Sequence, residues 1–348
     1  MGTSTQELRP AGGGPATLDP HPGGDSGRKR RRINWGFDRF SGLYVWALLI
    51  VIFGLWVPDT FLTVQTLRNI ASQEAITAML ALGLLIPLAA GAYDLSIGAM
   101  LGLALVLVTY FQSVLSWSPL VAIVATLAAG AVVGVLNGLV VVGLRVNSFI
   151  ATLGMSSILT ALIFWVSGGQ QITTNIPQGF KDLGRTEVAS IPLPVIYLAV
   201  LVLVLWIVME WRPLGRKLYA TGGNPVAARL SGVRTDRLVF LSLICSATIA
   251  ALAGIVFGAR IGSASLTAGP PFLLPAFAAV FLGSTQIRNG RANVLGTLIA
   301  VYLLATGVKG LLLVGVPLWV SDLFHGVTLI GAVALAVGRG RSLTSGSH

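Results

Sequence analysis

The sequence predicts an all-α fold, a polytopic bundle of about ten transmembrane helices, and three observations lead to this prediction. Of the 348 residues, 55% are apolar and only 10% are charged, whereas a soluble globular chain carries about 25% charged residues. The apolar residues gather in runs of roughly 20, the length that crosses a bilayer. The basic residues stand in short clusters between these runs, as they do in the loops of membrane proteins.

The first 40 residues predict a disordered, basic tail. Residues 1–27 are rich in Gly and Pro and hold almost no large apolar side chains, so they cannot form a packed core. A basic cluster at 28–32 then precedes the first apolar run. This order is similar to a signal peptide, but no small-residue cleavage site follows at Val57-Pro58. An uncleaved first span is therefore the favoured interpretation.

The transmembrane domain is predicted over residues 41–338. Its eighth segment is short and rich in proline, which predicts a bent or re-entrant element there; whether that segment fully spans is left open. The ten apolar segments are 41–57, 72–91, 94–115, 118–143, 148–168, 191–210, 238–258, 271–287, 292–312 and 319–338.

The basic residues predict the orientation of the spans. If the N-terminus is cytoplasmic and the spans alternate, all but five of the 23 Lys and Arg residues fall on the inner side. This asymmetry agrees with the positive-inside rule and places both termini, including a short tail over 339–348, in the cytoplasm. The exceptions are Arg68, Lys181, Arg185, Arg260 and Lys309.

The same alternation gives spans two to five and spans seven to ten opposite orientations, as an inverted repeat requires. Two connections are long: residues 169–190 on the outer side, with balanced charge, and residues 211–237 on the inner side, strongly basic. The other connections are tight, so no separate soluble domain is predicted.

The inner loop at 211–237 predicts a short helix outside the membrane. Asn224 can cap the free N–H groups, Pro225 suits the first helical position, and Gly232 suits a left-handed end. Two interpretations remain open: an interfacial loop anchored to anionic lipid, or a docking helix for a cytoplasmic motor. The residues predicted to form the helix and contact such a partner are Asn224, Pro225, Ala227, Ala228, Arg229 and Gly232.

The stretch GGNPVAARLSGV in this loop resembles the coupling loop of the ribose-type sugar permeases of ATP-binding-cassette (ABC) importers. Further elements resemble that family in the same order: AYDLSIG at 92–98, RVNSFIATLG at 145–154, and AFAAVFLGST at 276–285. Leu274-Pro275 and the stretch 287–289 depart from the family pattern, and branched-chain amino-acid ABC permeases share the broad architecture. The resemblance therefore specifies the mechanism more closely than the substrate.

This resemblance implies a permease subunit in a prokaryotic inner membrane, not an enzyme, that carries a monosaccharide delivered by an extracytoplasmic binding protein. It implies two permease copies, or a pair with a paralogue, and two ATPase subunits that dock on the 224–232 helix. The chain contains no Gly-Lys dipeptide, so it has no G-x-x-x-x-G-K-[ST] loop of its own for ATP. No cofactor, metal or nucleic acid is expected.

Six polar residues are candidates for the translocation pathway, because buried polar side chains need partners that a hydroxyl-rich solute can provide. For Asp94 the alternative is a helix cap that binds the amides of residues 96 and 97. For the others the alternative is hydrogen bonding between helices. The candidates are Asp94, Ser96, Asn137, Asn147, Thr152 and Ser156.

Glycines that recur every four residues predict close helix contacts. They stand at positions 130, 134 and 138, and again at 98 and 102.

The remaining functional alternatives are a branched-chain amino-acid ABC permease, a secondary transporter driven by an ion gradient, and a membrane enzyme. The second needs buried carboxylates near the midplane, of which the chain offers few. The third needs a catalytic cluster, and the three histidines lie far apart in sequence.

Overall fold

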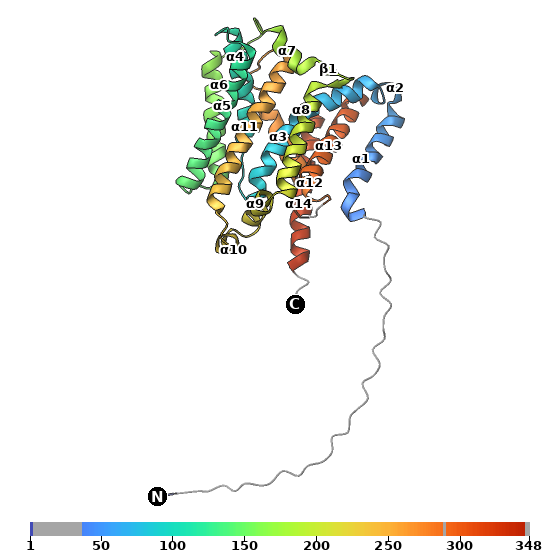
Figure 1. Ribbon diagram of the computed structural model, residues 1–348. Helices are drawn as coiled ribbons and strands as arrows, with labels where there is room; N and C mark the ends of the chain where they lie inside the picture. Colours follow the sequence, from blue (N-terminus) through green and yellow to red (C-terminus); the bar gives the residue numbers. More distant parts are fainter. Residues whose placement is uncertain (3–36, 288–289, 345–348) are drawn as a thin grey trace. The chain divides into compact units, whose positions relative to one another are not determined.

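The computed structural model describes residues 1–2, 37–287 and 290–344, and its described helices form an α-helical bundle (Figure 1). The contacts within the chain separate residues 1–35 from residues 36–348, and all described helices belong to the second unit. Within the tail predicted over residues 1–40, positions 3–36 lie outside the described residues, and helix α1 begins at Phe37. Residues 345–348 of the predicted C-terminal tail also lie outside them.

Helices follow one another along the first part of the chain with short connections. They are α1 Phe37–Trp56, α2 Pro58–Phe61, α3 Val64–Ala89, α4 Ile97–Ser113, α5 Pro119–Gly138 with the π-helical end η1 Leu139–Gly143, and α6 Ser148–Ser167.

The second part adds a small hairpin and the remaining helices, and Glu187 pairs with Pro192 in the antiparallel hairpin. The elements are α7 Gln178–Arg185, β1 Glu187–Val188, β2 Ile191–Pro192, α8 Leu193–Trp206 with η2 Ile207–Trp211, α9 Pro213–Gly223, α10 Pro225–Leu230, α11 Thr235–Ile261, η3 Pro270–Phe272, α12 Leu273–Ser284, α13 Val294–Val314 and α14 Trp319–Thr344.

The predicted all-α membrane bundle is confirmed. Among the described residues, six helical stretches are long and apolar enough to cross a membrane, and four shorter apolar helices lie at the other four predicted segments. The number of crossings and the side on which the termini lie stay predictions. The shorter helices are Gly42–Trp56, Ile97–Ser113, Pro270–Ser284 and Trp319–Ala334.

Three stretches are more helical or better ordered than the sequence predicted. Helix α3 begins at Val64, eight residues before the predicted 72, because the Thr63 hydroxyl caps it and accepts a hydrogen bond from Thr66 N at 3.2 Å. The outer loop holds α7 and the hairpin, and the inner loop holds α9 as well as α10. Hydropathy misses these parts because their turns are polar or short.

The packing of the helices follows the pattern of an inverted repeat. Helix α11 packs on α4 and α5, as α3 packs on α12 and α13, and α3 and α11 also contact each other. Within the two blocks, α4 contacts α5 and α6, as α12 contacts α13 and α14. These contacts of the first block have counterparts in the second, which supports the predicted arrangement of two opposed four-helix blocks.

The regularly spaced glycines lie where helices approach closely, as predicted. A Cβ on Gly130 would lie 2.6 Å from Ala251 Cβ, and one on Gly134 would lie 2.9 Å from the Leu243 carbonyl oxygen. Both neighbours belong to α11, so the α5 glycines form the contact between these two helices.

The second helix of each block begins after a partly buried non-helical stretch. A Cβ on Gly98, at the start of α4, would lie 3.3 Å from the carbonyl oxygen of Gly269, just before η3. The loop over 90–96 is buried in part, with Asp94 and Ser96 both fully inaccessible. Helix α12 has 12 residues and follows the 3-10 turn η3, so the proline-rich eighth segment is a short helix with a 3-10 start, and its bent or re-entrant course stays a prediction.

Candidate coupling and translocation site

Helix α10 has the start and the end that its sequence predicted. The Asn224 side chain accepts a hydrogen bond from Ala227 N at 3.0 Å, and Pro225 occupies the first helical position. Gly232 follows the helix with a φ of +80°, a conformation that glycine adopts without strain. Figure 1 shows α10 at the end of the bundle where α1 begins and α14 ends.

The outward face of α10 is apolar, a feature that was not predicted from the sequence. Val226 is 64% exposed and Leu230, one helical turn later, is 85% exposed, while Ala227 and Arg229 are also exposed. Ala228, predicted to contact a partner, is only 5% exposed because it faces its own chain. The signal was available in the i, i+4 spacing of the two large apolar side chains.

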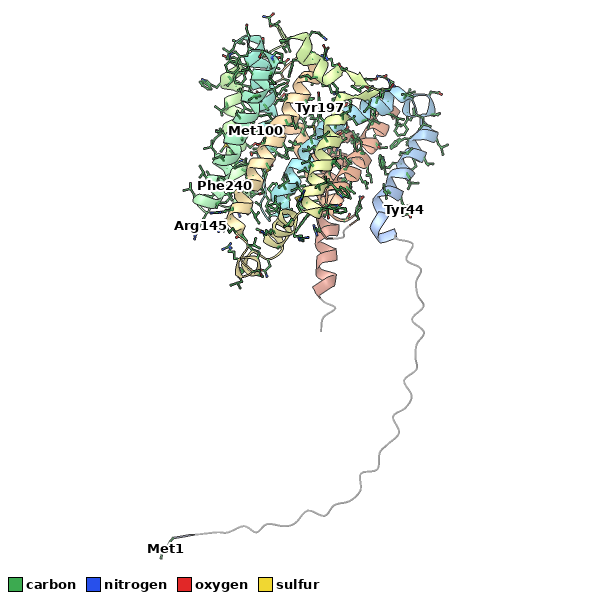
Figure 2. All side chains as sticks on the ribbon, viewed as in Figure 1. Met1, Tyr44, Met100, Arg145, Tyr197 and Phe240 are labelled. Carbon is green, nitrogen blue, oxygen red and sulfur yellow. The ribbon has the colours of Figure 1, made fainter. Side chains whose placement is uncertain are left out.

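Arg229 borders a polar cavity of about 400 Å³ between α10 and the loop before α6. Its Nε donates a hydrogen bond to the Thr235 hydroxyl at 2.9 Å, while Arg145 and Asp236 line the same cavity. Figure 2 shows Arg145 near the α10 end of the bundle. The cavity also reaches Gly91 and Ala92, so it connects α10 with the buried loop that precedes α4.

Three of the predicted pathway residues form one buried hydrogen-bonded chain. Asn137 Nδ2 donates to Ser96 Oγ at 2.9 Å, and Ser96 Oγ donates to Asp94 Oδ1 at 2.6 Å. The Ser96 amide donates to the same carboxylate oxygen at 3.0 Å. The alternative of a helix cap is therefore confirmed for the amide of residue 96, whereas among the described residues the amide of residue 97 makes no such hydrogen bond to Asp94.

Helix α6 holds the loop in place from the other side. The Thr152 hydroxyl accepts a hydrogen bond from Leu95 N, and the Ser148 hydroxyl accepts one from Tyr93 N, both at 3.0 Å. Thr152 was a predicted pathway residue and Ser148 was not. The loop over 90–96 is thus fixed to α5 and α6 by side chains that the sequence places about 40 to 60 residues away.

The cluster keeps oxygen atoms that have no partner among the described residues. Asn137 Oδ1 is one of them, while Asp94 Oδ2 and the Ser246 hydroxyl oxygen on α11 make no hydrogen bond of good geometry but lie close enough to interact with each other. Each of the three residues is at most 1% exposed. A buried polar group without a partner costs about 1–3 kcal/mol, so a hydrogen-bond donor placed beside these oxygens would stabilise the cluster.

The other two predicted pathway residues lie apart from this cluster. Asn147 is exposed and caps α6, where its side chain accepts a hydrogen bond from Phe149 N at 2.9 Å. Ser156 is half-buried one turn beyond Thr152, and its backbone carbonyl accepts from the Thr160 hydroxyl at 2.8 Å. The structure assigns Asn147 a capping role that the sequence analysis did not predict.

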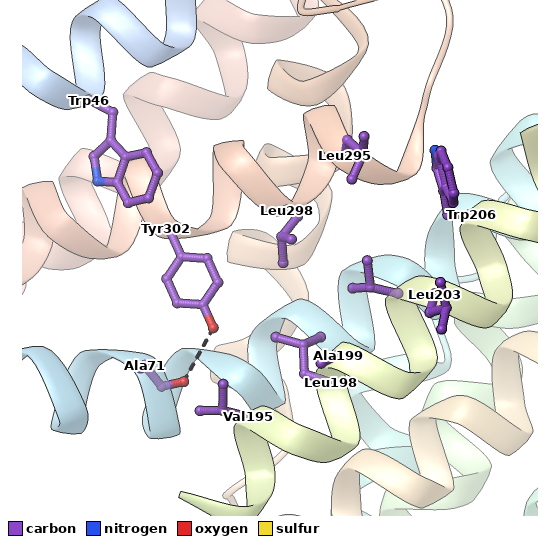
Figure 3. Close-up of a pocket in the computed structure, with 11 residues that line it drawn as sticks. Trp46, Ala71, Val195, Leu198, Ala199, Leu203, Trp206, Leu295, Leu298 and Tyr302 are labelled. Atoms are coloured by element: carbon purple, nitrogen blue, oxygen red, sulfur yellow. Dashed lines mark hydrogen bonds between the residues drawn. The ribbon is translucent and has the colours of Figure 1, made fainter. Parts of the chain in front are cut away.

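A second cavity, of about 790 Å³, lies between α1, α3, α8 and α13 and is apolar (Figure 3). The polar atoms of two aromatic side chains in its wall are bonded within the protein. Trp46 Nε1 donates to the Thr306 hydroxyl at 2.8 Å, and the Tyr302 hydroxyl donates to the Ala71 carbonyl oxygen at 3.3 Å. This cavity suits hydrocarbon rather than a hydroxyl-rich solute.

The opposite end of the bundle carries several of the basic residues that were predicted not to lie on the inner side of the membrane. Arg68 forms an ion pair with Glu187 at 3.2 Å, and Arg185 Nε donates to the Arg260 carbonyl oxygen at 2.9 Å. Arg68, Arg185 and Arg260 line one cavity of about 410 Å³. These side chains lie beside α7 and the hairpin, which Figure 1 shows at the end away from α10.

Known proteins match this chain over most of its length. The model of the family described as "Branched-chain amino acid transport system / permease component" matches residues 66–333. The chain is 33% identical over 313 residues to the ribose import permease protein RbsC of Escherichia coli (strain K12), and the matched region covers 88% of this chain and 96% of the relative. It is 35% identical over 299 residues to RbsC of Bacillus subtilis (strain 168), covering 85% and 91% of the two chains.

A third relative is the D-allose transport system permease protein AlsC of Escherichia coli (strain K12), 29% identical over 300 residues that cover 86% of this chain and 91% of the relative. No solved structure gives a significant match. The buried cluster, the capped helix α10 and these similarities lead to one conclusion. The chain is a multi-pass membrane protein and belongs to the family of ribose-type sugar permeases of ABC importers.

Proposed function

We propose that this chain is the membrane subunit of an ATP-driven importer for a monosaccharide in a prokaryotic inner membrane. An extracytoplasmic binding protein delivers the sugar at the end that carries α7, and two permease copies form the pathway. ATP hydrolysis takes place on separate subunits that dock on α10. The names of the relatives, two for ribose and one for D-allose, support a sugar over a branched-chain amino acid.

The observation that carries the proposal is the outward face of α10. Leu230 is 85% exposed and Val226 is 64% exposed on a helix that a side-chain cap and a left-handed glycine hold in one conformation. An exposed apolar pair beside the charged side chain of Arg229 resembles a protein–protein docking surface, which has an apolar centre and a polar rim.

For the pathway, the buried cluster of Asp94, Ser96, Asn137 and Thr152 supports a hydroxyl-rich solute. Its buried acceptor oxygens and its hydroxyl groups match the donors and acceptors of a sugar. In the described conformation the cluster is closed, so the sugar reaches it only when α4, α5 and α11 separate. We place Asn147 and Ser156 farther along the same route, on α6.

Uptake into vesicles tests the proposal against an ion-driven carrier. The chain is reconstituted with its ATPase subunit and binding protein, and uptake of radiolabelled ribose is followed with ATP, without ATP, and with ATP plus an uncoupler. The proposal predicts uptake that requires ATP and survives the uncoupler. Uptake that stops with the uncoupler and is indifferent to ATP would show a secondary transporter.

A further inference from the structure

The end of α9 touches the bundle through its backbone. A Cβ on Gly222 would lie 2.9 Å from Gly91 N and would collide with the Ala89 carbonyl oxygen. Conversely, a Cβ on Gly91 would lie 3.1 Å from Gly222 Cα. Gly91 has a φ of +81°, which favours glycine. Two backbones therefore meet here with no side chain between them.

This contact lies at the start of the loop that carries the buried cluster. Ala92 N donates to the Pro87 carbonyl oxygen at 2.9 Å, which closes the turn that ends α3. Only two residues separate Gly91 from Asp94, and one of them, Tyr93, is held by Ser148 through its amide. A displacement of the turn at Gly91 is thus passed along a short, bonded backbone to the cluster.

Helix α9 is joined firmly to α10. Only Asn224 separates the two helices, and it bonds to both: its amide donates to the Ala220 carbonyl oxygen at 3.1 Å, and its side chain accepts from Ala227 N at 3.0 Å. A push on α10 therefore moves the end of α9 that contains Gly222.

A further contact of α9 is with a loop of the second block. The Tyr219 hydroxyl donates to the Ala292 carbonyl oxygen at 2.9 Å, and the Arg291 guanidinium lies 3.4 Å from the centre of the Tyr219 ring. Residues 291 and 292 lie in the connection between α12 and α13. Helix α9 thus bridges loops of both four-helix blocks, which must move against each other for alternating access.

We propose that Gly222 is a positioning residue for energy coupling, through which movement of α10 reaches the Asp94 loop. This proposal rests on the proposed function of the chain as an ATP-driven permease. Backbone contact suits the task because it has no rotamers to absorb the displacement, whereas a longer side chain would yield by changing its rotamer.

The neighbouring glycine provides a matched control. Gly223 also belongs to the last turn of α9, but a Cβ there would meet nothing within 4 Å. Both Gly222→Ala and Gly223→Ala raise the helix propensity of the same turn, and only the first pushes α9 away from Gly91. Each variant is reconstituted with the ATPase subunit and the binding protein, and three quantities are measured: ATPase binding, stimulation of ATPase activity by ribose-loaded binding protein, and ribose uptake.

We expect Gly222→Ala to bind the ATPase subunit as the wild type does, to lose most of the stimulation, and to take up ribose at least tenfold more slowly. Gly223→Ala should match the wild type in all three. The proposed relay, which runs from α10 through Gly222 to the Asp94 loop, is overturned if Gly222→Ala imports ribose within twofold of the wild type or if Gly223→Ala is equally impaired. It is also overturned if Gly222→Ala loses ATPase binding, which would assign Gly222 to the docking surface.

Tyr219→Phe keeps the test decisive if Gly222→Ala does not accumulate in the membrane. This variant adds no atom and releases α9 from Ala292, so the ribose imported per ATP hydrolysed should fall severalfold while ATPase binding is unchanged. An unaltered ratio would overturn the relay. If the wild type itself shows no ATP-dependent uptake, the proposed function fails, and the coupling role of Gly222 fails with it. If the wild type imports ribose and the variants import it equally well, only the coupling role of Gly222 fails.

Discussion

At the scale of single residues, the buried carboxyl group of Asp94 organises the loop before α4. One of its oxygens accepts hydrogen bonds from both the amide and the hydroxyl of Ser96, and Asn137 extends the chain to α5. In a protein interior such bonds are cooperative, and the loss of one partner leaves the others buried and unpaired. The stability of the loop therefore depends on the acceptor oxygen at position 94.

This dependence predicts a difference between two substitutions of Asp94. Asp94→Ala leaves the Ser96 amide and hydroxyl without an acceptor and should lower the free energy of unfolding by about 2 kcal/mol. Asp94→Asn keeps one acceptor oxygen in the same place, so it should cost less than half as much. Thermal unfolding in detergent checks the pair, and equal losses would show that the acceptor is not what holds the loop.

The sequence allowed part of this site to be predicted and not the rest. Asp94, Ser96, Asn137 and Thr152 were identified because polar residues in apolar runs need partners, and the structure brings them together. Ser246 was missed because a single serine in an apolar helix carries no signal of its own. Its place beside Asp94 depends on how α11 packs on α4 and α5, which one sequence does not reveal.

At the scale of elements, the ends of helix α10 were predicted from the sequence more reliably than the exposure of its side chains. The cap at Asn224 and the glycine at 232 predicted the ends of α10 because both act within a few residues. Which side of α10 faces outward depends on its contacts with α9 and α11. For that reason Ala228 was assigned to the partner surface although it is buried.

The cap of α10 supplies a prediction about docking. Asn224→Ala removes the acceptor for Ala227 N and should destabilise the helix by about 1 kcal/mol, which corresponds to roughly fivefold weaker ATPase binding if the partner selects the folded helix. Asn224→Asp keeps a cap and should bind like the wild type. Titration of the ATPase subunit against permease in nanodiscs measures both, and equal affinity for all three chains would contradict the argument.

The contact between α5 and α11 supplies a prediction about stability. Gly134→Leu would insert a side chain where a Cβ already lies 2.9 Å from the Leu243 carbonyl oxygen, so it should cost about 1–3 kcal/mol. Gly154→Leu on α6 is the control, because a Cβ there meets nothing within 4 Å. Melting temperatures in detergent should fall for the first and not for the second; a fall of the same size in both would mean that the glycine spacing is incidental.

At the scale of the whole molecule, the described unit carries two kinds of chemistry at its two ends. The end with α10 carries an apolar knob with basic neighbours, and the end with α7 carries the ion pair between Arg68 and Glu187. The count of basic residues predicted only that the two ends differ in charge, because the positive-inside rule depends on the side of the membrane and not on packing. The side on which each end lies stays a prediction. The pairing of helices into two blocks needed the structure, since the residue-level similarity between the blocks is weak.

Labelling with a membrane-impermeant thiol reagent tests the orientation. Cys245 is replaced by Ser, and a single cysteine is placed at exposed Ser231 after α10 or at exposed Gln178 in α7. We expect Gln178→Cys to react in intact cells and Ser231→Cys to react only in inside-out vesicles. The reverse pattern, or reaction of both from one side, would contradict the predicted topology.

The central claim, that energy enters this chain through α10 from a separate ATPase, is tested most directly by the binding of that subunit to Leu230→Asp. The control is Leu214→Asp, which changes an exposed leucine at the start of α9. The account predicts that Leu230→Asp lowers ATPase binding and ATP-driven uptake at least tenfold, while Leu214→Asp leaves both near the wild-type level. Wild-type binding and uptake by Leu230→Asp, or accumulation of ribose by the purified chain without any ATPase, would contradict it.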